Sequence, residues 1–273
     1  MRTEVSYNYV ASWSEKLLAQ GRFSFGLHEL KTANEALSDT AIKFALKRLS
    51  DKGKVISVFK GYYLIIPPQY AVKGILPPHL YLDAFMKYLQ RPYYVSLLNA
   101  AVYHGASHQQ PQEFFVMTAF PALRPTIRKG LKINYISIKM APQELLERRK
   151  TEAGYLNISN AALTACDLVQ YEKRLGGLNR AATVLRELAD EIQHDAFHGI
   201  LLKFVHVTTL QRLGYLFDNV CEHPELADAL YESIERENIS LYRIPLKAAE
   251  ETKGFSSGNR WKVIVNTEIQ IDE

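Results

Sequence analysis

The strongest constraint on the fold is an apolar pattern in residues 39–51. Its apolar positions recur at spacings of three, four and seven, and they are Ile42, Ala45, Leu46 and Leu49. This period places them on one side of an α-helix, while Thr40, Lys43 and Lys47 lie on another side. Ser38 can cap the helix from just outside, and Gly53 ends it. The segment is therefore predicted to be an amphipathic helix that carries lysines on its solvent side.

The neighbouring residues predict two more helices and a hairpin. Helices are predicted at residues 12–20 and 27–33, with a short strand-like stretch at residues 23–25. The β-rich runs 55–59 and 62–66 flank a turn at Lys60-Gly61, which is typical of a hairpin. Three helices followed by a hairpin is the order of a winged helix-turn-helix, in which the hairpin is the wing. The alternative is a small α+β unit with no role in DNA binding.

Basic charge is concentrated in this N-terminal part. Residues 1–80 contain eight Lys and three Arg against two Asp and four Glu, a net charge of +5. The chain as a whole carries +4, so the remainder is close to neutral at −1. A basic domain on a near-neutral body is typical of a polyanion-binding protein, although an ordinary solvated surface can have the same composition.

We therefore predict that the third helix enters the major groove of DNA. Thr40 and Lys43 are expected nearest the bases, because the buried positions commit the opposite side of the helix to the core. Phosphate contacts are expected from Lys47, Lys54 and Lys60. At the wing, Tyr62 is expected to contact the DNA backbone or the minor groove.

Prolines between Pro67 and Pro78 predict a connector, and hence domains at residues 1–76 and 77–273. The fold class is predicted to be α+β, with an N-terminal winged helix-turn-helix followed by a mostly helical α/β C-terminal domain. C-terminal helices are predicted at residues 80–89, 94–104, 161–171, 179–194, 210–220 and 224–237. C-terminal strands are predicted at residues 113–118, 133–138, 241–246 and 261–265. A loop between the first two of these strands carries a second group of cations, Arg124, Arg128 and Lys129.

Histidine spacing offers a weak indication of a metal site. The pairs His104/His108 and His194/His198 are each four residues apart, which would place two imidazoles on one face of a helix. Neither pair has the glutamate of an H-E-x-x-H motif. We interpret them as surface or packing histidines and expect no metal and no cofactor.

Other reactive side chains also favour structural roles. Cys166 lies among apolar residues and is predicted to be a buried, inert thiol, and Asp167 beside it a core carboxylate. The chain lacks a nucleophile motif, a phosphate-binding loop and the paired carboxylates of a nucleotidyltransferase. It is therefore predicted not to be an enzyme.

Apolar runs and the cysteine count bear on where in the cell the protein is found. No apolar run is long enough to cross a membrane, and the first thirty residues lack the apolar core of a signal peptide. Two cysteines are too few for a disulfide framework. A cytoplasmic protein without a membrane partner is expected.

Three stretches of the sequence resemble the AbiEi-type antitoxins, regulators of type IV bacterial toxin–antitoxin systems. They are Tyr94–Gly105 (YVSLLNAAVYHG), Asn157–Val169 (NISNAALTACDLV) and Leu210–Asp218 (LQRLGYLFD). The order of a basic winged helix-turn-helix, a proline-rich hinge and an α/β body is similar as well. These motifs are structural rather than catalytic, so they indicate a family and not a reaction.

The resemblance implies a DNA-binding antitoxin and transcriptional autorepressor. Its DNA partner would be inverted repeats in its own promoter, and its protein partner a nucleotidyltransferase-type toxin that it counteracts with or without direct contact. The cationic group of Arg124, Arg128 and Lys129 is the candidate antitoxicity surface. The alternative is a winged-helix transcriptional regulator with a ligand-sensing C-terminal domain and no toxin partner.

Overall fold

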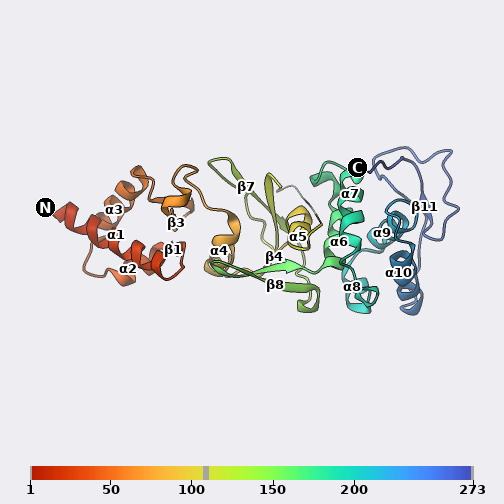
Figure 1. The fold of residues 1–273 in the computed structure, drawn as a ribbon, viewed down its shortest axis with the longest axis horizontal. Coiled ribbons are helices and arrows are strands. Elements are labelled where there is room, and N and C mark those ends of the chain that lie inside the picture. Colours follow the sequence, from red (N-terminus) through yellow and green to blue (C-terminus); the bar gives the residue numbers. More distant parts are fainter. Residues whose placement is uncertain (1, 107–110, 272–273) are drawn as a thin grey trace. The chain divides into compact units, whose positions relative to one another are not determined.

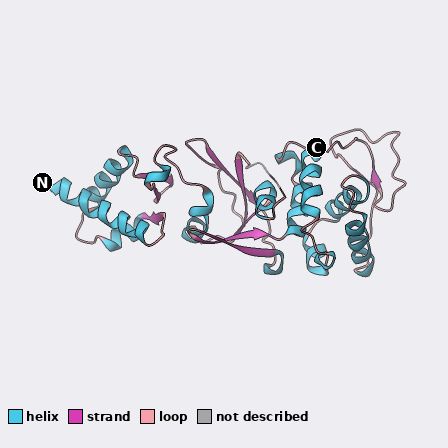
Figure 2. Ribbon diagram, in the orientation of Figure 1, coloured by secondary structure: helices cyan, strands magenta, loops and turns pink. Residues whose placement is uncertain are grey.

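The computed structural model describes residues 2–106 and 111–271, which form a mixed α/β fold (Figures 1 and 2). The chain divides into two compact units. Unit 1 contains Met1–Tyr93, Gln112–Met140 and Arg148–Asn157, and unit 2 contains Tyr94–Pro111, Ala141–Glu147 and Ile158–Glu273. The mixed α/β class expected from the sequence is confirmed.

The N-terminal part of unit 1 has three helices and a small sheet, at the red and orange end of Figure 1. The helices are α1 (Arg2–Ala19), α2 (Leu27–Ala33) and α3 (Asp39–Asp51). The strands are β1 (Ser24–Gly26), β2 (Val55–Phe59) and β3 (Tyr62–Ile65), which form an antiparallel sheet of order β1-β3-β2. The predicted helices at residues 27–33 and 39–51 and the predicted hairpin are confirmed.

Local chemistry explains the bounds of α3. The hydroxyl oxygen of Ser38 accepts a hydrogen bond from the backbone N–H of Ala41 at 3.2 Å, which satisfies one of the free N–H groups of the first turn. After the last turn, Gly53 has a φ of +66°, a conformation that glycine adopts at little cost. The buried residues of α3 are the four that the spacing predicts: Ile42, Ala45, Leu46 and Leu49.

Helix α1 begins at Arg2, whereas the sequence predicts a start at Ser12. Val10 and Leu17 are buried in the same core cluster as the inner side of α3. Tyr7 packs against the same cluster, and the Lys52 ammonium lies 4.4 Å from the centroid of its ring. The segment before Ser12 has few apolar residues, so the sequence pattern offers no apolar stripe from which a helix could be predicted there.

A second sheet, of order β6-β7-β5-β4-β9-β8, lies mostly in unit 1, which also contains α4 (Leu82–Tyr88). Its strands are β4 (Tyr93–Val95), β5 (Glu113–Thr118), β6 (Thr126–Arg128), β7 (Leu131–Ser137), β8 (Leu146–Thr151) and β9 (Gly154–Ser159). Strands β5 and β7 are parallel, and β6 is antiparallel to β7. The region between the two predicted strands is therefore not only a loop, because it contains β6.

Strands β8 and β9 were not predicted from the sequence. β8 lies at one edge of the sheet, and its residues, LERRKT, are intermediate or exposed throughout. An edge strand with this composition lacks the apolar alternation by which strands are recognised.

Unit 2 is mostly helical. Its helices are α5 (Leu97–Tyr103), α6 (Ala161–Gln170), α7 (Leu178–Ala189), α8 (Gly199–Phe204), α9 (Val207–Asn219) and α10 (Pro224–Arg236). Two short parallel strands close it, β10 (Ile244–Pro245) and β11 (Val263–Ile264). Nine consecutive residues of α6 are buried, from Ala161 to Val169, which makes α6 the central helix of the unit.

The sequence-based prediction differs from unit 2 at two helices. The helix predicted from Tyr94 begins at Leu97 instead, because Val95 belongs to β4 and pairs with Ile158 in β9. Helix α8 was not predicted.

None of the helices in residues 2–106 and 111–271 is long and apolar enough to cross a membrane.

Candidate functional site

The solvent side of α3 is the first candidate site. We call Thr40, Lys43, Phe44 and Lys47 the α3 outer face, since all four side chains are exposed. The opposite side of the helix packs against α1, which lies beside α3 in Figure 1. The outer face is thus a rigid, solvent-facing surface whose orientation is set by the buried side of the same helix.

Two cations of the α3 outer face have no ion-pair partner among the described residues, Lys43 and Lys47. Lys54, by contrast, pairs with Glu15 of α1 at 3.3 Å, and both side chains are largely exposed. An exposed pair of this kind contributes about 0 to 1 kcal/mol, so Lys54 can still exchange its partner for another anion. The free positive charge is therefore concentrated at Lys43 and Lys47.

The hairpin turn between β2 and β3 places Lys60 in solvent but Tyr62 in the core. The Tyr62 side chain is only 2% exposed, and its hydroxyl lies 2.6 Å from the Ser24 hydroxyl. Its ring packs against Phe85 and Tyr88, with centroids 5.0 and 4.9 Å away, and burial raises the pKa of its phenol. The prediction that Tyr62 contacts DNA is wrong, because the side chain is enclosed by residues of β1 and α4.

Phe44 is a residue of this surface that the sequence interpretation missed. Its side chain is 56% exposed, although phenylalanine is an apolar residue. The signal was present in the helical period, because Phe44 is offset by two positions from both Ile42 and Leu46. At about 100° per residue, this offset points Phe44 away from the core.

The second group of cations lies in unit 1 at the β6–β7 turn. Arg124 and Lys129 are exposed, and Arg128 is the last residue of β6. The Nε of Arg128 donates a hydrogen bond to the backbone oxygen of Ser57 in β2 at 3.2 Å. Lys129 lies over Gly74. Arg128 is thus engaged with the chain's own backbone, and the side chain of Lys129 is adjacent to Gly74, which leaves Arg124 the most available.

A buried carboxyl group is the most unusual feature of unit 2. The Oδ2 of Asp167 accepts hydrogen bonds from the hydroxyls of Ser96, at 2.6 Å, and Tyr94, at 3.3 Å. No ion pair to Asp167 is present among the described residues, and burial raises the pKa of its carboxyl from 3.8 to about 7. The predicted buried position of Asp167 is confirmed. Its carboxyl group accepts hydrogen bonds from neutral hydroxyl groups and not from a cation among the described residues.

The other titratable groups singled out from the sequence are also structural in their surroundings. Cys166 is buried, as predicted, and burial raises the pKa of its thiol. His104 is buried, with its Nε2 2.8 Å from the backbone oxygen of Ser159, while His108 lies outside the described residues. His194 and His198 line one shallow pocket with several acids. In the part of the chain that the structure describes, no three His, Cys, Asp or Glu side chains could together hold a metal ion.

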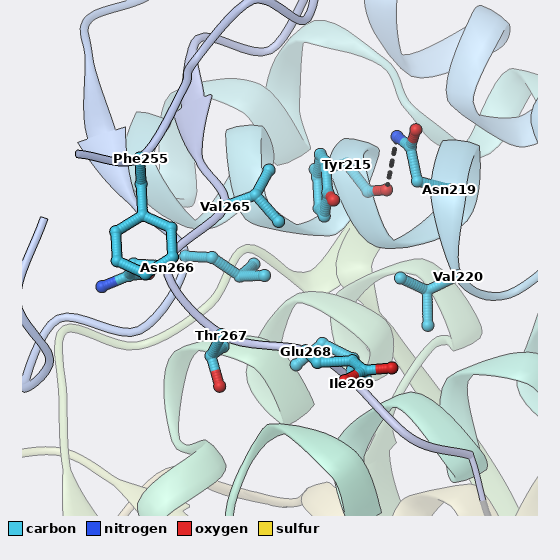
Figure 3. A pocket seen from close by; sticks show the side chains of 10 residues that line it. Tyr215, Asn219, Val220, Phe255, Val265, Asn266, Thr267, Glu268 and Ile269 are labelled. Atoms are coloured by element: carbon cyan, nitrogen blue, oxygen red, sulfur yellow. Dashed lines mark hydrogen bonds between the residues drawn. The ribbon is translucent and has the colours of Figure 1, made fainter.

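A pocket of about 560 Å³ in unit 2 lies between the end of α9 and residues 265–269 (Figure 3). Tyr215 and Asn219 line one side, and Asn219 donates a hydrogen bond to the backbone oxygen of Tyr215 at 3.1 Å. Glu268 is the single charged side chain among the described residues that line it. The pocket can hold a small molecule, but it offers no acid–base pair for catalysis.

The family comparison identifies the central part of the chain. Residues 94–219 match the model of the AbiEi antitoxin C-terminal domain. We call residues 94–219 the AbiEi domain, since they are similar to the C-terminal domain of AbiEi antitoxins. The resemblance inferred from three short stretches is thereby confirmed, since all three lie within these residues.

The AbiEi domain spans the carboxyl cluster and most of the helices of unit 2. Its matching stretches supply the residues around Asp167: Tyr94 and Ser96 come from the first stretch, and Asp167 comes from the second. The third stretch contains Gly214, where an added Cβ would collide with the ring of Trp261. The three stretches that resemble AbiEi antitoxins therefore contain residues that pack the domain.

Comparison with solved structures supports the fold of the whole chain. The crystal structure of the RV2827C protein of Mycobacterium tuberculosis is similar with a TM-score of 0.64, at 18% sequence identity. The match covers 93% of this chain and 91% of that one. At this identity the likeness concerns the fold alone. No curated protein matches the chain.

Proposed function

We propose that this protein is an antitoxin that also represses its own promoter. The AbiEi domain at residues 94–219 supports the antitoxin role. The α3 outer face supports the DNA-binding role, because it presents two lysines without an ion-pair partner among the described residues on a helix anchored by its buried side. The AbiEi domain carries the proposal, because it ties the chain to a toxin–antitoxin system before any detail of DNA binding is considered.

Residues 1–76 are proposed to be a winged helix-turn-helix with its connector, and residues 77–273 the antitoxin domain. Helices α2 and α3 would form the helix-turn-helix, and the β2–β3 hairpin would be the wing. In this arrangement α3 lies in the major groove, with Thr40 and Lys43 nearest the bases and Lys47, Lys54 and Lys60 nearer the phosphates. A single such domain has a small interface, so binding to paired half-sites in inverted repeats is proposed.

A salt titration of promoter binding tests the DNA-binding role. Replacing both Lys43→Ala and Lys47→Ala should weaken binding, because two cations on the DNA-facing side of α3 are lost. The slope of log K against log salt should fall by about 0.9 for Lys47, and by up to about 1.8 where Lys43 also neutralises a phosphate. The matched control removes the same charge from exposed positions of unit 2, Lys173→Ala with Lys253→Ala, and should leave the slope unchanged. Equal slopes for the wild type and the α3 variant would reject α3 as the recognition helix.

Co-expression with the proposed partner, a toxin of the nucleotidyltransferase type, tests the antitoxin role. Full-length protein should restore growth, and the Lys43→Ala/Lys47→Ala variant should restore it equally, because repression and neutralisation are proposed to be separable. Charge reversal by Arg124→Glu with Lys129→Glu should lose rescue while keeping promoter affinity. Arg128 is left intact in this variant, because its bond to Ser57 has a structural role. Full rescue by the reversed variant would remove this loop from the antitoxicity surface.

One observation favours a second candidate function, a regulator that senses a ligand without any toxin. It is the pocket of about 560 Å³ beside Tyr215, which is large enough for a small metabolite. The co-expression assay separates the two functions, since a ligand-sensing regulator would leave a toxin fully active.

A further inference from the structure

Phe44 occupies the centre of the α3 outer face. It is one turn after Thr40 and directly follows Lys43, and Lys47 lies three residues further along the helix. With 56% of its surface exposed, it is one of the large apolar side chains that the fold leaves in water. Phe25 and Tyr62 of the same domain are buried and used for packing, whereas Tyr9 of α1 and Phe59 of β2 are exposed but lie outside the α3 outer face.

The surroundings of Phe44 indicate what kind of partner can cover it. The adjacent free cations, Lys43 and Lys47, have no carboxylate partner among the described residues. A surface with two unpaired lysines beside an exposed ring is complementary to a polyanion that also presents apolar groups. B-DNA has both properties, since its phosphates are anionic and its major groove exposes the C5 methyl groups of thymine.

We propose that Phe44 is a sequence-reading residue that packs against thymine methyl groups in the major groove, an inference that rests on the proposed DNA-binding function. The phenyl ring has no hydrogen-bond donor or acceptor, so it cannot read the polar edges of bases. Apolar contact with a thymine methyl is the readout that remains for it. Lys47 holds the helix against the backbone beside this contact, Lys43 lies next to it near the bases, and Phe44 selects A·T pairs at the positions it covers.

The test uses the promoter segment that the wild-type protein protects in a footprinting experiment, prepared once with thymine and once with deoxyuridine at every thymine position. The two duplexes have the same charge and the same base pairing, and they differ only in the C5 methyl groups. The wild-type full-length protein should bind the thymine duplex more tightly, by about four-fold for each methyl that Phe44 buries. Phe44→Ala should bind the thymine duplex more weakly, and its preference for thymine over deoxyuridine should fall by the same factor.

Two further measurements separate this role from a structural one. The salt slope of Phe44→Ala should equal that of the wild type, because an apolar contact releases no counterions. Phe255→Ala is the matched control, since Phe255 is an exposed aromatic residue of unit 2 with 44% of its surface exposed, and it should keep the full thymine preference.

The outcomes are distinct. An equal thymine preference in the wild type and Phe44→Ala overturns the role of Phe44 while leaving DNA binding intact. An equal loss of affinity for both duplexes, with a lower molecular mass in solution, would assign Phe44 to a contact between copies of the chain and also overturns it. Wild-type protein that binds neither duplex overturns the proposed DNA-binding function itself, and the inference with it.

Discussion

The buried carboxyl group of Asp167 makes the stability of unit 2 dependent on pH in a predictable direction. Burial raises its pKa from 3.8 to about 7, so between these values the folded chain holds a proton that the unfolded chain has released. Stability therefore falls as the pH rises across this range. The contribution of the retained proton is fully present below pH 3.8 and is lost as the pH rises through about 7.

The substitution Asp167→Asn isolates this effect. An amide does not titrate, and its oxygen can still accept the hydrogen bonds from Ser96 and Tyr94. Its NH₂ group adds donors without partners, which lowers stability by an amount that does not depend on pH. The free energy of unfolding of the variant relative to the wild type should therefore rise by about 2 to 3 kcal/mol between pH 5 and pH 8.

Urea unfolding of the full chain at a series of pH values measures this difference. Asp190→Asn is the matched control, because it removes an exposed carboxylate of the same unit and should lack the trend. The reasoning would be refuted if the difference in unfolding free energy between Asp167→Asn and the wild type stayed constant from pH 5 to pH 8. It would mean that Asp167 is already ionised in the folded protein at pH 5.

Two stability predictions follow from close contacts elsewhere in the chain. Gly214→Ala should destabilise unit 2 by about 1 to 3 kcal/mol in urea unfolding, because the new methyl group collides with the buried ring of Trp261. Gly258→Ala should cost much less, because the new Cβ would meet only the exposed Ser256 side chain, at 3.3 Å, and an equal effect at both sites would contradict this account. Ser38→Ala should cost about 1 kcal/mol, because the first turn of α3 loses the oxygen that accepts one of its N–H groups. Ser38→Asn should restore most of this loss in thermal unfolding, and an unchanged stability of Ser38→Ala would show that the cap contributes nothing.

Much of the candidate DNA-binding surface could be predicted from the sequence. The bounds of α3 and its four buried residues followed from the helical period, which depends only on the spacing along the chain. The same period already indicated that Phe44 faces solvent, although the sequence interpretation considered only the polar residues there. The AbiEi likeness could also be recognised, because the residues that pack its helices lie in short continuous stretches.

Predictions failed where contacts join distant parts of the chain. Tyr62 follows the hairpin turn and was assigned to the DNA surface, but Phe85 and Tyr88 of α4 cover its ring. Arg128 was grouped with a free loop, yet it ends a strand and donates to the backbone of Ser57. In each case the partner lies more than twenty residues away, so no local spacing contains the information.

The sequence by itself determined which residues of α3 face inward, how the basic charge is distributed and which family the central residues resemble. These properties depend on the order and spacing of residues within single elements. Only the tertiary structure decided that Tyr62 is enclosed, that α1 starts at Arg2 and that a neutral cluster surrounds Asp167. The reason is physical: a side chain is removed from water by whatever packs over it, and the chain brings those covering residues together from positions far apart in the sequence.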